Sequence, residues 1–391
     1  MIHSKLESVY DRINYIIIAL YKVGTQVFYC HKFILANSSE VFKVMMYSSC
    51  WPESKMSEII LREHERHCKQ FEKFLAYFYK SEVTVCQKCV DSLIFLADKY
   101  LVGNLKNLCV TYMAEQVRHM SIQRTLEWFK TARFLCLEDL SQKCLEIICW
   151  NSYEVVESPD WKNLDKELVL SMLKNSDLVI QGEYTLFLAL LNWLTERTLA
   201  HASELLPFIR FSQMKVYELQ AVKNSILCQD KELKSLIKKL VSKAYKLRAL
   251  LSHQSELNLS FGKDYYKPRN YLDFSVDDFK LRENIRCGIT STVQAISSAI
   301  PSETCNAEWQ LTYRKFNNAN TGSLRFVCQN SEAGEGFAQA VILIKESLRV
   351  INVIKSDVTT YAPQAHLALD VSLPEGNLRE NLTILIKFIP K

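Results

Sequence analysis

The sequence predicts a multi-domain α+β protein, in which an α/β domain is followed by an all-α helical domain and then by an antiparallel β-sandwich. Three observations lead to this prediction. The chain has 391 residues, too many for one ordinary core and enough for two or three domains of roughly 100–150 residues each. Apolar residues recur with the 3.6-residue period of a helix as far as about residue 248. Beyond about residue 270 the period becomes two, which is typical of half-buried strands.

The composition is that of a folded protein with a small net charge. Hydrophobic residues make up 48% of the chain and charged residues 23%, which excludes a disordered protein. With 48 basic and 43 acidic residues the net charge is only +5, so we expect no nucleic-acid partner. The apolar run at residues 15–20 is too short for a signal core or a membrane span. The thirteen cysteines are scattered in apolar segments, which favours free thiols in a cytoplasmic protein.

The first hundred residues alternate between strand and helix signals. A strand, a turn and a return strand are expected, in that order, at residues 13–20, 22–25 and 26–30. Ser38 or Ser39 is placed to cap a following helix with its hydroxyl. Phe42, Met45 and Met46 then repeat at helical spacing, so we expect that helix to bury one apolar face.

Another short strand and two more helices follow. Residues 59–61 are apolar and read as a strand. Two later stripes repeat at i, i+3, i+4 and i+7, and each predicts an amphipathic helix. Their members are Phe71, Phe74, Leu75 and Phe78 for the first, and Leu93, Leu96, Ala97 and Tyr100 for the second.

This N-terminal pattern resembles a BTB (POZ) domain. The resemblance rests on "VFYCHKFILANSSEVFKVMM" at residues 27–46 and on "FEKFLAYFY" followed by "LIFLADKYLVGNLKNLC". It implies a BTB domain over residues 1–118 and a protein partner in the form of a second copy. Because only about twelve residues precede the first strand, we expect the homodimer to use apolar helix faces near the N-terminus.

Residues 119–248 show helical periodicity throughout, with no alternating segment. Two stripes carry the signal, formed by Leu140, Cys144, Ile147 and Ile148 and by Leu186, Leu190, Trp193 and Leu194. An antiparallel helical bundle that buries its own core explains them. The segments "TARFLCLEDLSQKCLEIICWN" and "LVLSMLKNSDLVIQGEYTLFLALLNWL" resemble the BACK domain that follows BTB in many adaptor proteins. Glu183 matches the glutamate of the BACK signature.

A basic segment and a connector come next. Residues 231–248 carry seven basic residues on a helical pattern, which most often marks a solvated helix face. Residues 249–270 are expected to be a linker. Pro268 supports a boundary there because it disfavours helix at the residue before it.

The last domain, residues 271–391, is expected to be the β-sandwich. Its alternating segments predict a core that contains Trp309, Leu311, Leu369, Ile384 and Ile386. The segment "AEWQLTYRKF" resembles a strand of TRAF-like (MATH-like) domains. The whole order therefore resembles a BTB–BACK protein with a C-terminal TRAF-like domain.

No motif predicts catalysis, a cofactor or a metal. Cys86 and Cys89 form a single Cys-x-x-Cys pair, whereas a zinc site needs four ligands, so we expect two buried thiols in a helical segment. The cluster His64, His67 and Cys68 lies in a charged connector and is expected to be a solvated turn. There is no glycine-rich phosphate loop, GxSxG or HExxH. The sequence predicts no enzyme.

One short motif points to a partner. In BTB adaptors of cullin-type ubiquitin ligases, a hydrophobic-x-Glu triplet docks on the cullin scaffold, and Trp51-Pro52-Glu53 matches it. Docking needs an exposed apolar anchor with an acceptor two residues on, because aromatic anchors carry much of an interface's energy. The alternative is that Trp51 folds back on its own domain.

Two functions follow from these resemblances. The first is a non-catalytic cytoplasmic adaptor that self-associates through its BTB domain and bridges a cullin scaffold to a partner of the β domain. The second is a secreted or surface scaffold of the galectin-3-binding type, which would require that the N-terminus be truncated. The first predicts free thiols and the second predicts paired cysteines.

Overall fold

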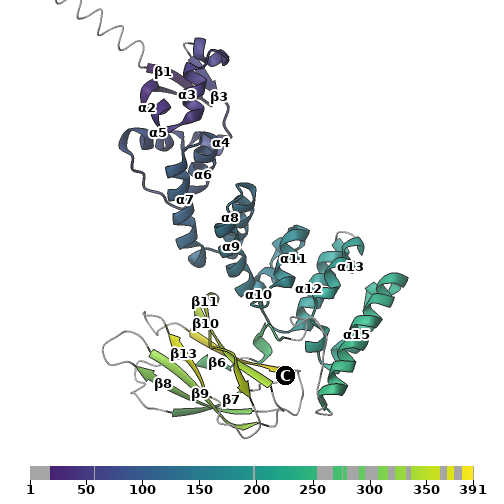
Figure 1. The fold of residues 1–391 in the computed structure, drawn as a ribbon. Coiled ribbons are helices and arrows are strands. Elements are labelled where there is room, and N and C mark those ends of the chain that lie inside the picture. Colours follow the sequence, from purple (N-terminus) through teal and green to yellow (C-terminus); the bar gives the residue numbers. More distant parts are fainter. Residues whose placement is uncertain are drawn as a thin grey trace, which may run out of the picture. The chain divides into compact units, whose positions relative to one another are not determined.

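The structure is a computed structural model of the 391-residue chain (Figure 1). It describes residues 18–56, 58–196, 199–252, 267–274, 276–279, 290–295, 307–315, 322–331, 336–361, 368–373 and 381–390. The chain divides into two compact units. Unit 1 is Met1–Val117 with Lys130–Ser141, and unit 2 is Arg118–Phe129 with Gln142–Lys391.

Unit 1 contains a three-stranded sheet in the order β2-β1-β3. Its strands are β1 (Ile18–Val23), β2 (Gln26–His31) and β3 (Glu58–Leu61). The first two form an antiparallel hairpin, and β3 runs parallel to β1. The hairpin turns at Gly24, whose positive φ of 58° favours glycine. The predicted hairpin is confirmed over the described residues, while residues 13–17 lie outside them.

Helices cover one face of this sheet. They are α2 (Lys32–Ser38), α3 (Glu40–Tyr47), α4 (Glu65–Cys68), α5 (Phe71–Lys80), α6 (Val90–Lys99) and α7 (Gly103–Gln116), with a 3₁₀ turn η1 (Pro52–Lys55) after α3. The predicted cap of α3 is Ser39, whose Oγ accepts a hydrogen bond from the Phe42 N–H at 3.1 Å. Both predicted stripes are buried.

Aromatic rings fill the core of unit 1. Phe42 stacks on Tyr100 with 4.6 Å between ring centroids and meets Tyr21 edge-on at 5.6 Å. Phe74 packs against Tyr100 at 5.5 Å and against Phe78 at 5.1 Å. These offset and edge-to-face pairs add to the free energy gained from burying the rings.

The helical part of unit 2 is a series of short helices joined by 3₁₀ turns. The helices are α8 (Ile122–Phe134), α9 (Glu138–Trp150), α10 (Ser152–Glu157), α11 (Lys166–Lys174), α12 (Glu183–Glu196), α13 (Ala202–Leu205), α14 (Val216–Lys223) and α15 (Lys231–Ser252). The 3₁₀ turns are η2 (Val117–His119), η3 (Pro159–Asn163), η4 (Leu199–His201), η5 (Leu206–Phe208), η6 (Phe211–Gln213) and η7 (Ile226–Gln229). Every residue of the two stripes predicted here is buried.

One feature of the helical part was not predicted. Strand β4 (Val179–Ile180) lies between α11 and α12 and pairs in parallel with β5 (Asn270–Tyr271). The expectation of a purely helical segment is therefore wrong at these residues. Two residues are too few to show a period in the sequence. Strand β5 lies in the stretch that reads as a connector, and Arg269, Asn270 and Tyr271 are all buried there.

The basic helix α15 is amphipathic. Its apolar residues Leu233, Ile237, Val241, Ala244 and Leu247 are buried, while most of its lysines are exposed. The prediction of a solvated basic face is confirmed for those lysines. Arg248 departs from it, because its guanidinium donates to the backbone oxygen of Met214.

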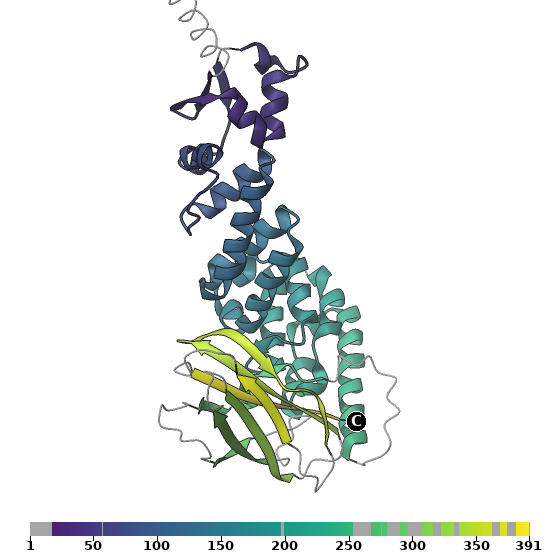
Figure 2. The same cartoon turned by 60° about the vertical axis from the view of Figure 1, so that its left-hand side comes forward.

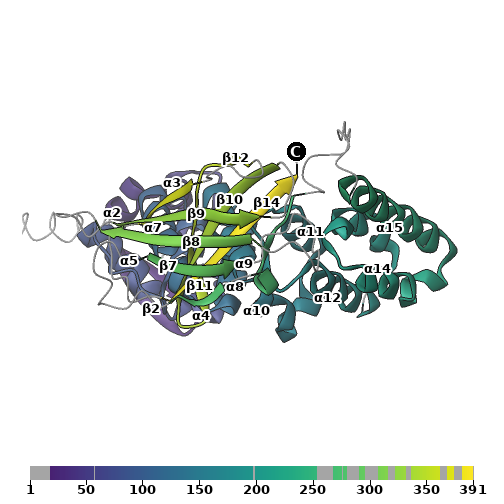
Figure 3. The same ribbon diagram turned by 90° about the horizontal axis from the view of Figure 1, so that it is seen from below.

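The C-terminal strands form two antiparallel sheets. The first has the order β11-β10-β14-β6, with β12 also paired to β10, and the second has the order β13-β9-β8-β7. Their bounds are β6 (Val276–Phe279), β7 (Thr290–Ala295), β8 (Ala307–Lys315), β9 (Gly322–Ser331), β10 (Gly336–Glu346), β11 (Arg349–Lys355), β12 (Thr359–Tyr361), β13 (Ala368–Leu373) and β14 (Asn381–Pro390). A short 3₁₀ turn, η8 (Leu272–Phe274), leads into β6. Figure 3 looks onto the long strands β7, β8 and β9 side by side.

The predicted change of period is confirmed by these strands. Ile384 and Ile386 of the predicted core are buried on β14. Trp309 and Leu311 lie on β8 and Leu369 lies on β13, but their side chains are outside the described part of the structure. In Figure 2 the yellow strands of the first sheet lie beside the teal helices of unit 2.

Candidate functional site

Two places in the chain bring together side chains that bear on function. The first is the turn after α3 in unit 1, which carries the predicted anchor Trp51 and Glu53. The second is a buried polar network in unit 2, where the end of the predicted linker and Tyr271 meet the helical part. Each is described within its own unit.

The turn after α3 holds its backbone with short-range hydrogen bonds. The Trp51 N–H donates to the Ser48 oxygen at 3.1 Å. The Trp51 oxygen accepts from the Ser54 N–H at 3.2 Å and from the Ser54 hydroxyl at 2.7 Å. Pro52 occupies the first position of η1, where its fixed φ suits a helix start. These contacts fix the backbone at Trp51.

The side chains on this turn are partly open to solvent. Trp51 is 41% exposed, and Tyr47 and Met56 on either side are 59% and 51% exposed. Glu53 is half-buried, and its Oε2 atom is buried without a hydrogen-bond partner. An unpaired buried carboxylate oxygen is costly. The arrangement offers an apolar anchor with an acceptor two residues on.

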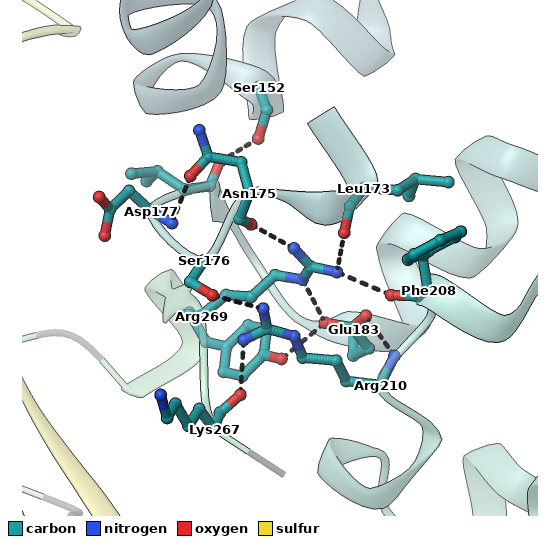
Figure 4. A network of polar contacts seen from close by, with 12 residues as sticks. Ser152, Leu173, Asn175, Ser176, Asp177, Glu183, Phe208, Arg210, Lys267 and Arg269 are labelled. Carbon is teal, nitrogen blue, oxygen red and sulfur yellow. Dashed lines mark hydrogen bonds and ion pairs between the residues drawn. The ribbon is translucent and has the colours of Figure 1, made fainter. Parts of the chain in front are cut away.

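The network in unit 2 is centred on the ion pair between Glu183 and Arg269 (Figure 4). Glu183 begins α12, and its Oε2 lies 3.2 Å from the Arg269 Nε. Neither side chain has any exposed surface. The Arg269 guanidinium also donates to the backbone oxygens of Leu173, Phe208 and Asn175. Three carbonyls at the ends of two helical segments are thereby satisfied together with the charge.

Two further residues complete the coordination of Glu183. The Tyr271 hydroxyl donates to its Oε2 at 2.6 Å, and the Arg210 N–H donates to its Oε1 at 2.7 Å. Burial, and then the adjacent carboxylate, raise the pKa of Tyr271 well above its ordinary value, so the phenol stays a donor. The Arg210 guanidinium binds the Lys267 oxygen at 2.6 Å and the Ser176 Oγ at 2.7 Å (Figure 4). The network therefore anchors residues 267–271 to the helices.

The first sheet is joined to the same helices by side-chain contacts with strand β11. The Asn151 side chain donates to the Val350 oxygen at 2.9 Å and accepts from the Val350 N–H at 2.8 Å. It thus pairs with the strand edge as another strand would. Arg349 donates to the Met120 oxygen at 2.6 Å and lies 3.1 Å from a Glu154 oxygen. Tyr153 donates to the Leu348 oxygen.

Apolar and charged side chains also connect the helical part to the first sheet. Val179 of β4 packs in one cluster with four buried residues of the first sheet, Val341, Leu343, Val350 and Leu385. Lys387 of β14 is buried, and burial lowers its pKa to about 7, although the nearby Asp177 acts to raise it. The Lys355 ammonium lies 2.6 Å from an Asp177 carboxylate oxygen. We refer to this set of contacts between the helices and the first sheet as the joint.

The structure corrects the expectation for the Cys-x-x-Cys pair. Cys86 and Cys89 do not lie within a helix, because Cys86 belongs to a turn and Cys89 is the residue before α6. Only Cys89 is buried, and Cys86 is half-buried. The reason is that residues 82–86 run without regular structure before α6 begins at Val90. Among the described residues, no group of three His, Cys, Asp or Glu side chains is placed to hold a metal ion.

The histidine cluster also differs from expectation. His67 is buried, with its ring 5.5 Å from that of Phe95, rather than solvated. Burial lowers its pKa, with the charge of Arg66 as the next cause. The charged neighbours in the sequence suggested a solvated turn, but α4 turns this one ring inward. Within the described residues, no helix has both the length and the apolar character to cross a bilayer.

Sequence reasoning found part of these sites. It selected Trp51, Glu53 and Glu183, but it treated residues 249–270 as a linker, began the β domain at residue 271, and missed the roles of Arg269, Tyr271 and Asn151. The one available signal was the polar string around Pro268, which combines an arginine, an asparagine and a tyrosine. No period connects it to Glu183, which lies 86 residues earlier.

Two known families match the N-terminal and central parts of the chain. Residues 17–117 match the BTB/POZ domain family, and residues 125–224 match the BACK family, described as "BTB And C-terminal Kelch". The chain therefore carries a BTB domain followed by a BACK domain, which defines it as a protein of the BTB–BACK interaction class. These domains are typical of non-catalytic adaptors.

Within that class the chain is similar to BTB/POZ domain-containing protein 17. It is 32% identical to the Mus musculus protein over 182 residues, which cover 46% of this chain and 36% of the relative. Galectin-3-binding protein of Mesocricetus auratus is 25% identical over 307 residues, or 76% of this chain and 51% of the relative. Kelch-like protein 11 of Mus musculus is 26% identical over 235 residues, or 58% and 32%. The chain thus spans about a third to a half of these relatives.

Proposed function

We propose that this chain is a non-catalytic adaptor that docks on a cullin-type ubiquitin ligase scaffold through Trp51 and Glu53. Its BTB domain self-associates, and its C-terminal sheets, as a TRAF-like sandwich, hold the partner to be modified. The single observation that carries the proposal is the hydrogen-bonded turn on which Trp51 is partly exposed, with the half-buried Glu53 two residues on.

The geometry of this turn also gives a physical argument for docking. A half-exposed indole on a fixed backbone loses little entropy when a partner's pocket covers it. The half-buried Glu53 carboxylate two residues on is a charged acceptor for a donor of the partner. The BTB and BACK domains, together with the similarity to Kelch-like protein 11, support an adaptor role, because these domains are typical of protein-interaction adaptors.

Self-association is proposed from exposed apolar residues at the start of unit 1. Tyr29 and Phe33 are each 70% exposed, and Val27 is 46% exposed. Large apolar side chains that are adjacent in sequence and exposed together are typical of protein-binding surfaces. Light scattering of the purified chain at micromolar concentration is expected to give the mass of a dimer, and a monomer alone would contradict this part.

The docking proposal is tested by titrating the chain against the N-terminal region of a cullin. Trp51→Ala should weaken binding about thirtyfold or more, because a buried aromatic anchor is commonly worth about 2 kcal/mol. Glu53→Ala should weaken it less, because a charge near the rim is partly screened by water and salt. The melting temperature of both variants should stay close to that of the wild type.

A matched control separates docking from non-specific binding through an exposed aromatic side chain. Tyr217→Ala removes an aromatic side chain on α14 that is 61% exposed, and it should leave cullin binding unchanged. If Trp51→Ala lowers the melting temperature and leaves binding as it was, the indole stabilises its own domain. If the folded wild type does not bind a cullin, the ligase role is wrong and a scaffold of the galectin-3-binding type becomes the better explanation, which the 76% coverage by that relative favours.

A further inference from the structure

Two thiols in the BTB unit lie within contact distance of each other. The Sγ atoms of Cys86 and Cys89 are 3.3 Å apart. The Cys89 N–H donates to the Cys86 oxygen at 3.0 Å, so the four residues form a tight turn. Such a turn keeps its end Cα atoms within about 7 Å, close to the separation that a disulfide spans. A bond between the sulfurs would require them to approach to about 2 Å.

The surroundings of Cys89 provide donors for sulfur. Cys89 is 1% exposed and precedes the first turn of α6. The Lys73 ammonium on α5 lies 3.3 Å from its Sγ, and the Cys86 N–H donates to the same atom at 3.3 Å. Positive charge and N–H donors stabilise negative charge on sulfur as a bond forms or breaks there.

Cys86 is the accessible member of the pair. It is half-buried, and Gln87 and Lys88 beside it are exposed. Donation from the Cys89 thiol lowers the pKa of Cys86, whereas burial raises the pKa of Cys89. Cys86 is therefore the thiol that ionises first and the one a small solute reaches.

We propose that Cys86 and Cys89 form a redox-active dithiol that hydrogen peroxide oxidises to an intramolecular disulfide. The Cys86 thiolate attacks one peroxide oxygen, the O–O bond breaks, and the hydroxide that leaves takes up a proton to become water. Cys86 is now a sulfenic acid. The Cys89 sulfur attacks the Cys86 sulfur, the S–O bond breaks, and the departing oxygen leaves as a second water with the Cys89 proton. The two sulfurs lose two electrons and the peroxide gains them.

In the part of the chain that the structure describes, the other thiols lack this combination of access and a partner. Cys109, Cys144 and Cys149 are buried, and burial raises the pKa of each to about 12. Cys136 is exposed on the short turn after α8. It serves as an internal reference for a surface thiol in the same protein.

The sequence makes the proposal simple to test by mass spectrometry. Trypsin cuts after Lys80, Lys88 and Lys99, so the two thiols fall on separate peptides, residues 81–88 and 89–99, with no other cysteine in either. The full chain is treated with hydrogen peroxide at neutral pH, alkylated, and digested. We expect the two peptides to appear as one cross-linked species, two hydrogens lighter than their sum, and dithiothreitol to separate them. Their oxidation should be about tenfold faster than that of Cys136, because a thiolate is the reactive form.

Variants assign the two roles. In Cys89→Ser, Cys86 should still be oxidised but should progress to sulfinic acid, because no second thiol intercepts it. In Cys86→Ser, the remaining Cys89 should react no faster than Cys136, because it is buried. Thermal melts verify that both variants fold. If one variant does not fold, the oxidation rates of Cys86 and Cys136 in the wild type, measured as a function of pH, still test the proposal. Cross-linking absent from the folded wild type, or oxidation of Cys86 no faster than that of Cys136, would overturn the proposal.

Discussion

The core of unit 1 and the joint in unit 2 are built from different kinds of side chain. In unit 1, Phe42, Phe74 and Tyr100 pack ring against ring. At the joint and the network beside it, charges, amides and backbone groups meet in the interior, with Arg269 and Glu183 at the centre. Apolar packing tolerates small shifts, whereas each buried polar group must find its partner. The polar region is therefore the part of the chain more easily broken by one small change.

The largest effect is expected from the aromatic core. Phe42→Ala should cost roughly 3–5 kcal/mol of stability, because it removes a ring that contacts Tyr21, Phe78 and Tyr100 and leaves a cavity. Hydrogen exchange followed by mass spectrometry should show faster exchange in α3 and α5. Phe42→Leu, which keeps most of the volume, should cost much less. Equal costs for the two variants would show that shape does not set the stability of this core.

A somewhat smaller effect is expected from the buried ion pair. Arg269→Met keeps an unbranched apolar stem but leaves Glu183 as a buried, partly compensated charge, which should cost about 3 kcal/mol. Denaturant unfolding gives the free energy. The double variant Arg269→Met with Glu183→Met should recover part of the loss, because no buried charge remains. A single variant as stable as the wild type would contradict the importance of polar pairing here.

The smallest effect concerns pH. Burial lowers the pKa of Lys387 to about 7, so between that value and its ordinary pKa the unfolded chain holds one proton more than the folded chain. Stability should then rise between pH 7 and 9 by up to about 1.4 kcal/mol per pH unit. Above pH 9 two buried thiols begin to lower the stability as the pH rises, because burial raises the pKa of Cys144 and Cys149 to about 12.

The control for the pH effect is a lysine in solvent. Lys387→Met should remove the rise between pH 7 and 9, whereas Lys246→Met on the exposed face of α15 should preserve it. Chemical denaturation at several pH values measures both. An unchanged slope in Lys387→Met would assign the pH dependence to other groups.

The sequence predicted the features that depend on nearby residues. The Ser39 cap is set by a residue three positions on, and the stripe through Phe71 and Phe78 by helical spacing. What escaped prediction depends on distant residues, such as the Asn151 side chain pairing with Val350 across 199 positions. Periodicity carries no information about such partners. The position of Cys86 outside a helix was also missed, because it depends on where α6 begins.

The pairing of β4 with β5 shows that the segment matching the BACK family is shorter than the segment that folds together. The BACK match ends at residue 224, but the carboxylate at the start of α12 finds its counter-ion only at Arg269. A fragment cut at the end of the match would hold Glu183 without Arg269 or Tyr271. During synthesis, likewise, Glu183 acquires its buried partners only when the chain has reached residue 271, and Asn151 acquires Val350 later still, so this part of the molecule completes its folding late.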